Sequence, residues 1–411
     1  MDLGVSQKVT PLLEQVQDMV RSEIMQLDVE YHSEVGKAEG GDRFQFTARQ
    51  TEIREGLKAE ARRRGLWNFW LTDSKEGYGL NTVEYAYLAE EMGWCMLAPE
   101  IFNCNAPDTG NMEVIERCGS DAQKERWLKP LLEGEIRSAY LMTEPDVASS
   151  DATNIALEAK LENGEWVLNG EKWWASGAGD PRCAVYIVMV CTNPDAEEKH
   201  KRHSQMLIPA DTPGIEVLRP MQVFGQDDAP HGHMHIRFTN VRVPEDAVIL
   251  GEGRGFEISQ RRLGPGRIHH AMRAIGQAER ALELLCQRST QRVAFGKPLA
   301  RLGQNPDIIA ECRMEIEQAR LLCLKAAWMI DQGDPKAAAP WISKIKVIAP
   351  RVALKVTDEA IQIHGGMGVS QDTPLAGLWT GLRTLRLADG PDAVHRMVIA
   401  RSEMRKYGAN H

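Results

Sequence analysis

The stretch that decides the fold lies near the middle of the chain, where residues 156–168 read Ala-Leu-Glu-Ala-Lys-Leu-Glu-Asn-Gly-Glu-Trp-Val-Leu. Two strand-like runs flank Asn163-Gly164, a dipeptide that tolerates positive φ at both central positions of a tight turn. This arrangement predicts a β-hairpin. The apolar run over residues 184–190 predicts a buried strand, and the polar stretch 192–205 predicts a surface loop.

The sequence on either side of this region is typical of helices. Residues 1–137 contain helix-forming runs that Gly and Pro interrupt. A helical period returns after about residue 250, where apolar residues recur at helical spacing at Ile275, Ala278, Leu282 and Leu285. We therefore expect an α+β chain. Its predicted domains are an N-terminal helical domain (1–137), a central β-domain (138–249) and a C-terminal helical domain (250–411).

Composition narrows the class of protein. The 411 residues are 43% hydrophobic and carry 49 Lys and Arg against 58 Asp and Glu, a net charge of −9. An acidic balance argues against nucleic acid as the main partner, because phosphate binding needs a basic surface. The longest apolar run, residues 183–191, is too short to span a bilayer. Eight cysteines without C-x-x-C spacing, and an N-terminus that suits neither a secretory signal nor a transit peptide, favour a cytoplasmic enzyme. A eukaryotic chain would belong in the mitochondrial matrix or the peroxisome.

Common cofactor and metal motifs are missing from the sequence. No G-x-G-x-x-G follows a strand, and there is no G-x-x-x-x-G-K-[ST] loop and no H-E-x-x-H. His231, His233 and His235 alternate, so on a strand their imidazoles share a face and could converge on a metal. True ligand sets are rare, and we interpret the three as a polar strand face. No metal site is predicted.

Four segments in order along the chain carry the functional signal, namely residues 139–151, 169–177, 292–299 and 362–368. Each is weak alone, but the ordered set resembles the acyl-CoA dehydrogenase family over nearly the whole chain. The resemblance implies a helical domain, a β-barrel or sandwich domain and a C-terminal four-helix bundle. It also implies FAD, an acyl-CoA substrate, an electron-transferring flavoprotein as partner and a homotetramer built as a dimer of dimers. The implied reaction removes the α-proton while a β-hydride passes to flavin N5, which leaves the trans-2-enoyl-CoA.

The resemblance also assigns a flavin-binding surface. Thr143 and Ser176 would hydrogen-bond the isoalloxazine edge while Trp174 packs against the ring. One residue more than usual separates Pro145 from the Ser-Asp pair, so either Ser149 or Ser150 would lie near the phosphates. By the same resemblance, Arg292, Phe295, Gln362 and the glycines after Gln362 would bind the flavin of a neighbouring subunit. The full predicted cofactor set is Tyr140, Met142, Thr143, Ser149, Ser150, Trp174, Ser176, Arg292, Phe295, Gln362, Gly365 and Gly366.

The base for the α-proton is predicted near the C-terminus. Most members of the family carry a Glu before a Gly there, and a minority carry the base on the long helix, where this chain has Gly266. Asp389 occupies the C-terminal position, with Gly390 after it, and is the predicted catalytic base. An apolar cavity covered by flavin would raise its basicity. Arg267 and Gly390 are the predicted substrate-binding residues.

The Asp at position 389 is shorter than the usual Glu by one methylene, about 1.5 Å of reach. This feature, with residues 144–151 and 227–232, resembles the branch that animals fuse to a kinase-like domain and that is linked to 4-hydroxyacyl-CoA breakdown. We expect a stand-alone, bacterial-type member. Two alternatives stay open. The same base could eliminate water or phosphate from a 4-oxygenated acyl-CoA, or the protein could be a catalytically silent flavoprotein or scaffold, against which a carboxylate at position 389 argues.

Overall fold

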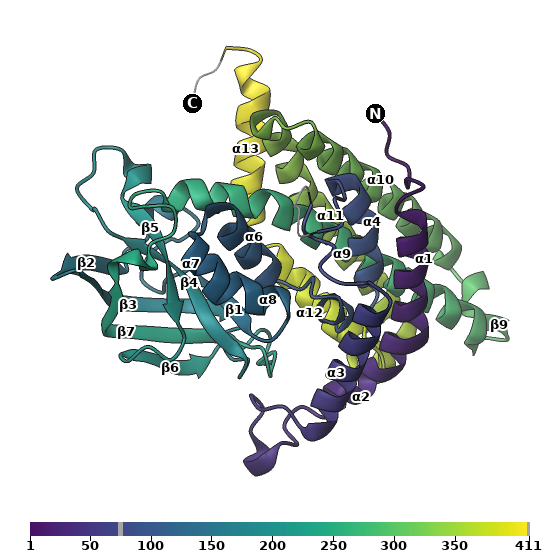
Figure 1. Cartoon of the computed structure of the whole chain (residues 1–411). Coiled ribbons are helices and arrows are strands. Elements are labelled where there is room, and N and C mark those ends of the chain that lie inside the picture. The colour runs from purple at the N-terminus through teal and green to yellow at the C-terminus, as the bar shows by residue number, and fades with distance from the viewer. Residues whose placement is uncertain (73–76, 409–411) are drawn as a thin grey trace. The chain divides into compact units, whose positions relative to one another are not determined.

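The structure is a computed structural model that describes residues 1–72 and 77–408, with their side chains except at 260–265. The helices are α1 (Thr10–Met19), α2 (Met25–Ser33), α3 (Ala48–Arg63), α4 (Thr82–Met92), α5 (Ala98–Ile101), α6 (Asp108–Cys118), α7 (Asp121–Gln123), α8 (Lys129–Leu132), α9 (Gly255–Gln291), α10 (Asn305–Asp331), α11 (Pro335–His364), α12 (Leu375–Leu385) and α13 (Asp392–Arg405). The strands are β1 (Arg137–Leu141), β2 (Glu158–Glu162), β3 (Glu165–Ser176), β4 (Cys183–Cys191), β5 (His203–Pro209), β6 (Ile215–Pro220), β7 (His233–Pro244), β8 (Val293–Ala294) and β9 (Lys297–Pro298). Helices therefore occupy both ends of the chain and the main sheet its middle (Figure 1), which confirms the predicted α+β fold class.

Contacts divide the chain into two compact units that combine distant segments. The helical unit comprises Met1–Asp28, Phe69–Pro99 and Gly264–His411. The sheet unit comprises Val29–Asn68 and Glu100–Leu263. Each unit has its own core and its own part of the predicted site.

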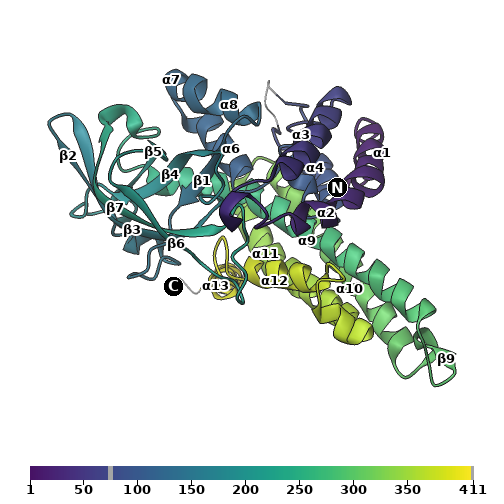
Figure 2. The same cartoon turned by 90° about the horizontal axis from the view of Figure 1, so that it is seen from below.

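The sheet unit is built on one mixed sheet. Its strand order is β1-β4-β2-β3-β7-β6, with β5 paired to β4, and β1 runs parallel to β4. The β2–β3 hairpin pairs Glu162 with Glu165 around Asn163 and Gly164, whose φ values are +55° and +84°. The Asn-Gly prediction is therefore confirmed. Helices α6, α7 and α8 lie together beside β1 and β4 (Figure 2).

The core of the sheet unit follows the apolar faces of these strands. The predicted buried strand is β4, in which Val185–Val190 are all buried. The predicted loop over 192–205 is too long, because β5 begins at His203 and its first three residues are buried. Their donor groups find partners inside the unit: the His203 imidazole Nε2 lies 2.9 Å from the Ile155 carbonyl, and the Gln205 amide N–H donates to the Gly255 carbonyl at 2.9 Å. The Gln205 amide oxygen is buried and has no hydrogen-bond partner among the described residues. Because most of these buried polar groups are hydrogen-bonded, the polar run can continue as a strand.

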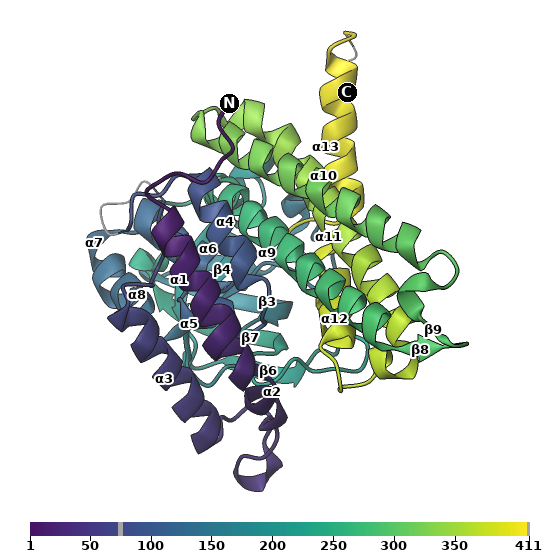
Figure 3. The same ribbon diagram turned by 90° about the vertical axis from the view of Figure 1, so that its right-hand side faces the viewer.

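The helical unit packs long helices from the C-terminal half against α1 and α4. The predicted apolar stripe of α9 is buried at each of its four positions, Ile275, Ala278, Leu282 and Leu285. Close backbone contact between α4 and α9 depends on Gly276, because a Cβ there would lie 1.9 Å from the Glu90 carbonyl oxygen. Helix α11 packs against α10, α12 and α13, and the β8–β9 hairpin joins the ends of α9 and α10 (Figure 3). Within the described part of the chain, we find no helix with the length and apolar character that crossing a membrane requires.

Candidate active site

A bulge in β3 forms the first part of the candidate site, in the sheet unit. The β3–β7 register shifts between Lys172 and Ala175, and at this point the Trp173 backbone N–H donates to the Thr143 carbonyl at 3.0 Å. Trp174 adopts a left-handed backbone with φ +55° and is 37% exposed. A non-glycine residue held in this region is strained and commonly marks a functional position. The bulge therefore exposes a large aromatic side chain to solvent beside Thr143, which lies in the loop after β1.

Ser176 lies two residues further along β3 and, like Thr143, is half-buried. Its hydroxyl lies 2.8 Å from His233 Nδ1 on β7, and the His233 ring lies 5.9 Å from the Trp174 ring. Thr143, Trp174 and Ser176, which the sequence predicted as one group, are thus brought together. His233 was not among the predicted cofactor residues, and only the β3–β7 register reveals it as their neighbour.

A buried ion pair holds the segment under this surface. Lys172 Nζ lies 2.7 Å from a Glu144 carboxylate oxygen and donates to the Met142 carbonyl at 3.0 Å. Burial lowers the pKa of Lys172 to about 8, while Glu144 opposes this shift. Glu144 also accepts from the backbone N–H groups of Ala156 and Leu157. The pair anchors the loop after β1, and it was missed because a Lys inside a strand pattern gives no sign of its partner.

The remaining predicted cofactor residues of this unit differ in whether their side chains already hydrogen-bond within the protein. The Ser149 hydroxyl accepts from the Glu144 backbone N–H at 2.9 Å, whereas Ser150 is exposed. The Tyr140 hydroxyl lies 3.1 Å from the Ser259 hydroxyl and accepts from Gln205 at 3.1 Å. The hydroxyl groups of Ser149 and Tyr140 therefore make hydrogen bonds within the protein itself.

The predicted anion cradle lies at one exposed end of the helical unit. Arg292 follows α9 and is exposed, and Phe295 in the β8–β9 turn is 97% exposed. Gln362 lies in the last turn of α11, Gly365 and Gly366 follow the helix, and all three are exposed. A small pocket joins the ends of α9, α10 and α11; it is lined by Leu285, Ser289, Asn305, Ile308, Glu359, Gln362 and Ile363. The two sequence segments of the cradle therefore follow helix ends that lie at the same end of the unit.

The Asp389 loop connects α12 to α13 in the helical unit. Asp389 has φ +53° and Gly390 has φ +93°, so the chain turns through two consecutive left-handed residues. The Asp389 carbonyl accepts from Arg267 Nη2 at 3.2 Å and lies 3.1 Å from His395 Nε2. The Asp389 side chain is 23% exposed, and its Oδ2 lies 3.6 Å from His270 Nε2. The structure thus brings Asp389, Gly390 and Arg267 together, as the sequence predicted.

Two buried side chains that the sequence did not single out hold this loop. His395 Nδ1 lies 3.3 Å from the Ser343 hydroxyl, and burial, with a further contribution from Arg267, lowers the His395 pKa to about 4. Lys346 on α11 donates to the Leu385 carbonyl at the end of α12. Burial lowers the pKa of Lys346 to about 8, against the opposing charge of Asp389. Nothing in a single sequence relates α11 to a loop about forty residues later.

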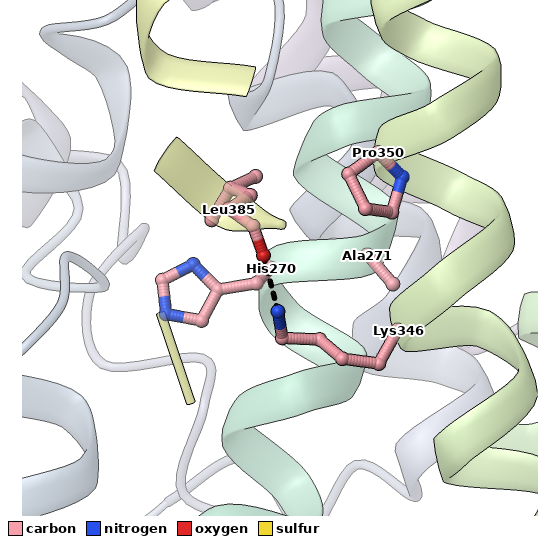
Figure 4. Close-up of a pocket in the computed structure, with 5 residues that line it drawn as sticks. All are labelled: His270, Ala271, Lys346, Pro350 and Leu385. Atoms are coloured by element: carbon pink, nitrogen blue, oxygen red, sulfur yellow. Dashed lines mark hydrogen bonds between the residues drawn. The ribbon is translucent and has the colours of Figure 1, made fainter. Parts of the chain in front are cut away.

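Lys346 also lines a small pocket next to the loop. The pocket is formed by His270, Ala271, Lys346, Pro350 and Leu385, and Figure 4 shows the amine of Lys346 directed at the Leu385 carbonyl beside the His270 ring. His270 is further approached by Arg273 Nη2, which lies 3.3 Å from its Nδ1. Cationic and hydrogen-bonding groups therefore gather close to the Asp389 carboxylate.

The three alternating histidines each have a protein partner. His231 Nδ1 lies 2.9 Å from Asp180, and His235 Nε2 lies 2.7 Å from Glu171, while His233 contacts Ser176 as described above. In residues 1–72 and 77–408, no group of three or more His, Cys, Asp or Glu side chains has the geometry of a metal site. His231 lies before β7, so of the three only His233 and His235 share that strand, and each of the three contacts a neighbouring polar side chain.

Comparison with known families matches nearly the whole chain. Residues 12–135 match the model of the acyl-CoA dehydrogenase N-terminal domain, residues 139–241 the middle domain and residues 253–404 the C-terminal domain. The three family domains follow one another along the chain in the same order as the observed N-terminal helices, central sheet and C-terminal helices.

Individual relatives agree with this match. The protein named probable acyl-CoA dehydrogenase FadE2 of Mycobacterium tuberculosis is 50% identical over 99% of this chain and 98% of its own. Acyl-CoA dehydrogenase family member 11 of Rattus norvegicus is 52% identical over 85% of this chain, which spans only 45% of that protein. A candidate acyl-CoA dehydrogenase solved from Mycobacterium abscessus has a TM-score of 0.93 at 52% identity, covering 98% of this chain and 100% of that one. Butyryl-CoA dehydrogenase of Megasphaera elsdenii has a TM-score of 0.81 at 27% identity, with coverage of 98% and 100%.

Proposed function

The chain belongs to the acyl-CoA dehydrogenase family, whose members are FAD-dependent oxidoreductases acting on CH–CH bonds, and we propose that Asp389 is its catalytic base. The observation that carries this proposal is the conformation of the Asp389 loop. Donors from two helices fix the backbone of Asp389, while its carboxylate stays partly exposed. A carboxylate held in this way can meet a substrate in a defined orientation.

The residues present fit FAD. The exposed Trp174 side chain offers a flat face for a flat cofactor, and Thr143 and Ser176 supply polar groups beside it. In the helical unit, Arg292 offers a planar donor set for phosphate. A Cβ added at Gly365 or Gly366 would meet nothing within 4 Å, which leaves room for close approach to a pyrophosphate. We propose the full predicted cofactor set on this basis.

The chain's own residues would handle the proton. The Asp389 carboxylate takes the proton from the α-carbon of the thioester, and the electron pair of that C–H bond becomes part of the new α,β double bond. Bound FAD supplies the acceptor for the hydride that leaves the β-carbon. Arg267 and His395 keep the Asp389 backbone in place during the transfer. Arg267 could also reach substrate from this position, and Gly390 leaves space beside the base.

Replacement of the base tests the proposal directly. Asp389→Asn keeps the shape of the side chain without its basicity, so turnover should fall by at least roughly a hundredfold while FAD content and thermal stability persist. Rapid mixing of acyl-CoA with the oxidised enzyme would follow flavin bleaching. A variant that bleaches at the wild-type rate would show that the base lies elsewhere, and a wild-type protein without bound FAD would remove the dehydrogenase function altogether.

Assembly and electron transfer are further parts of the proposal. Phe295 and Arg292 are exposed in the described chain, as expected if they meet the flavin of a neighbouring subunit in a dimer of dimers. Arg292→Ala should then weaken both FAD retention and assembly, and sedimentation with absorbance at flavin wavelengths would measure the two together. We propose an electron-transferring flavoprotein as acceptor. For a bacterial chain we propose the cytoplasm, supported by the M. tuberculosis relative.

A second candidate function uses the same base on a 4-oxygenated acyl-CoA, from which it would eliminate water or phosphate. The gathering of Lys346, His270 and Arg267 around Asp389 favours it, because such groups can stabilise a polar or anionic substituent. A panel of straight-chain, branched and 4-oxygenated thioesters would compare flavin bleaching with phosphate release. Oxidation of plain chains without binding of any 4-oxygenated thioester would eliminate this candidate and leave the dehydrogenase.

A further inference from the structure

The Asp389 loop is fixed at both of its ends by side chains from other helices. At its start, Lys346 of α11 donates to the Leu385 carbonyl. At its end, His395 of α13 and Arg267 of α9 converge on the Asp389 carbonyl, at 3.1 Å and 3.2 Å. The second anchor coincides with the two left-handed residues of the loop, Asp389 and Gly390.

His395 is suited to a permanent role as a donor. A carbonyl oxygen only accepts hydrogen bonds, so the neutral imidazole is assigned its proton on Nε2, and its Nδ1 can then accept from the Ser343 hydroxyl. The side chain is buried, with 2% relative exposure. Because burial keeps the His395 pKa near 4, the ring stays neutral and this pattern persists over the physiological range.

The neighbouring glycine shows how closely the ring and the loop fit. A Cβ on Gly390 would lie 3.1 Å from His395 Nε2, which is tighter than ordinary contact. Gly390 is therefore needed for its φ of +93° and also for the space that the imidazole occupies. Ring, glycine and carbonyl form one packed unit beside the carboxylate.

We propose that His395 is a positioning residue for Asp389, with Lys346 as a second anchor: by fixing the two carbonyls of the loop they aim the carboxylate at the substrate. The inference rests on the proposed role of Asp389 as base. A short carboxylate depends strongly on its anchoring, because misplacement by about 1 Å can cost roughly a hundredfold in rate. Neither residue needs to touch the substrate for this effect.

The test replaces the donor and then restores it. His395→Leu keeps the bulk of the side chain without a hydrogen bond, and we expect kcat per bound flavin to fall by about ten- to a hundredfold with KM for acyl-CoA within about twofold. His395→Gln restores an N–H donor for the carbonyl and should recover most of kcat. Lys346→Met should lower kcat in the same direction. If His395→Leu does not fold, His395→Asn, whose amide is too short to reach the carbonyl, takes its place.

A matched control separates positioning from general stability. His203 in the sheet unit is also buried and lies 2.9 Å from a backbone carbonyl, that of Ile155. His203→Leu should lower the melting temperature but leave kcat per bound flavin near the wild-type value. Equal kcat in the His395 and His203 leucine variants, or no recovery in His395→Gln, would overturn the proposal.

Crystal structures of the variants give a readout that does not depend on turnover. The Asp389 carbonyl should shift in His395→Leu and return to its place in His395→Gln. An unmoved loop in His395→Leu would overturn the positioning role. If wild-type protein turned over no acyl-CoA, the proposed function would fail, and this structural comparison would still decide whether His395 fixes the loop.

Discussion

Two carboxylates, one in each unit, are held in different ways: one belongs to a buried ionic cluster, and the other is the proposed base. Glu100 in the sheet unit lies 2.7 Å from Arg182 and 3.0 Å from both Lys58 and Arg137. Burial alone would raise its pKa, but these three cations hold the pKa of Glu100 well below the usual range. Asp389 in the helical unit has its backbone fixed instead, and its carboxylate keeps 23% exposure with an imidazole nitrogen 3.6 Å away.

The two residues differ in which of their atoms the surrounding cations and hydrogen-bond donors contact. Around Glu100 the cations neutralise the carboxylate itself, so it cannot serve as a base near neutral pH. Around Asp389, Arg267 and His395 donate to the backbone carbonyl, which orients the side chain, and the carboxylate itself stays partly exposed beside His270. A base needs orientation as well as access to its substrate, and on this ground we propose the second arrangement as that of the base.

The largest expected effect comes from breaking the Glu100 cluster. Glu100→Gln keeps the shape but removes the charge that compensates Lys58, Arg137 and Arg182, whose side chains are largely buried. Loss of one partner of a buried ionic cluster typically costs about 3–5 kcal/mol. We expect a strongly lowered melting temperature of the oxidised protein by calorimetry. The Asp389→Asn variant, measured in parallel, should melt close to wild type. Similar melting of the two variants would contradict the distinction between a structural and a reactive carboxylate.

How far these features follow from sequence differs between the units. The Asn163-Gly164 turn, the buried β4 run and the α9 stripe obey local rules and were predicted. The Thr143, Trp174 and Ser176 group followed from the family resemblance, and the structure adds the bulge that exposes Trp174. His203–Gln205 was predicted as loop because polar residues signal exposure until their buried partners are known.

Most of the features that could not be predicted from the sequence are hydrogen bonds and ion pairs between residues far apart in the chain. His395, Lys346 and Lys172 act through carbonyls or carboxylates that lie on other elements. Hydrophobic periodicity reports which face of an element is buried, and it carries no information on which buried donor meets which acceptor. The domain boundaries at about 137 and 249 stay a prediction, because the two compact units divide the chain in another way.

Gly390 lies directly after Asp389 and packs against His395, so a substitution there should affect the orientation of the proposed base. Gly390→Ala combines backbone strain at φ +93° with a contact 3.1 Å from His395 Nε2, so it should disturb the aim of Asp389 as well as stability. We expect kcat to fall about tenfold, toward the cost of a misplaced catalytic group, with backbone strain of about 1–3 kcal/mol. Steady-state kinetics and melting curves would measure both.

The matched control for this substitution is Gly333→Ala in the turn between α10 and α11. Gly333 also has a left-handed φ, +74°, but a Cβ there would meet nothing within 4 Å. It should lose a similar amount of stability through backbone strain and keep kcat per bound flavin. Equal kinetic loss in both variants would mean that strain alone, and no contact with His395, explains the Gly390 effect.

The smallest expected effect is on the pH dependence of stability, which reports on His395 without any measurement of activity. Its pKa falls from an ordinary value of 6.5 to about 4, chiefly through burial. Between these two values the unfolded chain binds a proton at this imidazole that the folded chain does not bind. Protons therefore favour the unfolded state there, and stability is lost as pH falls from about 6.5 to about 4. His395→Gln lacks this titration, so its melting temperature should decline less steeply than that of wild type over the same interval. Parallel melting curves at closely spaced pH values would measure the difference in slope. Identical slopes would show that the imidazole is not held neutral by burial and would remove the reason for treating it as a permanent donor to the Asp389 carbonyl.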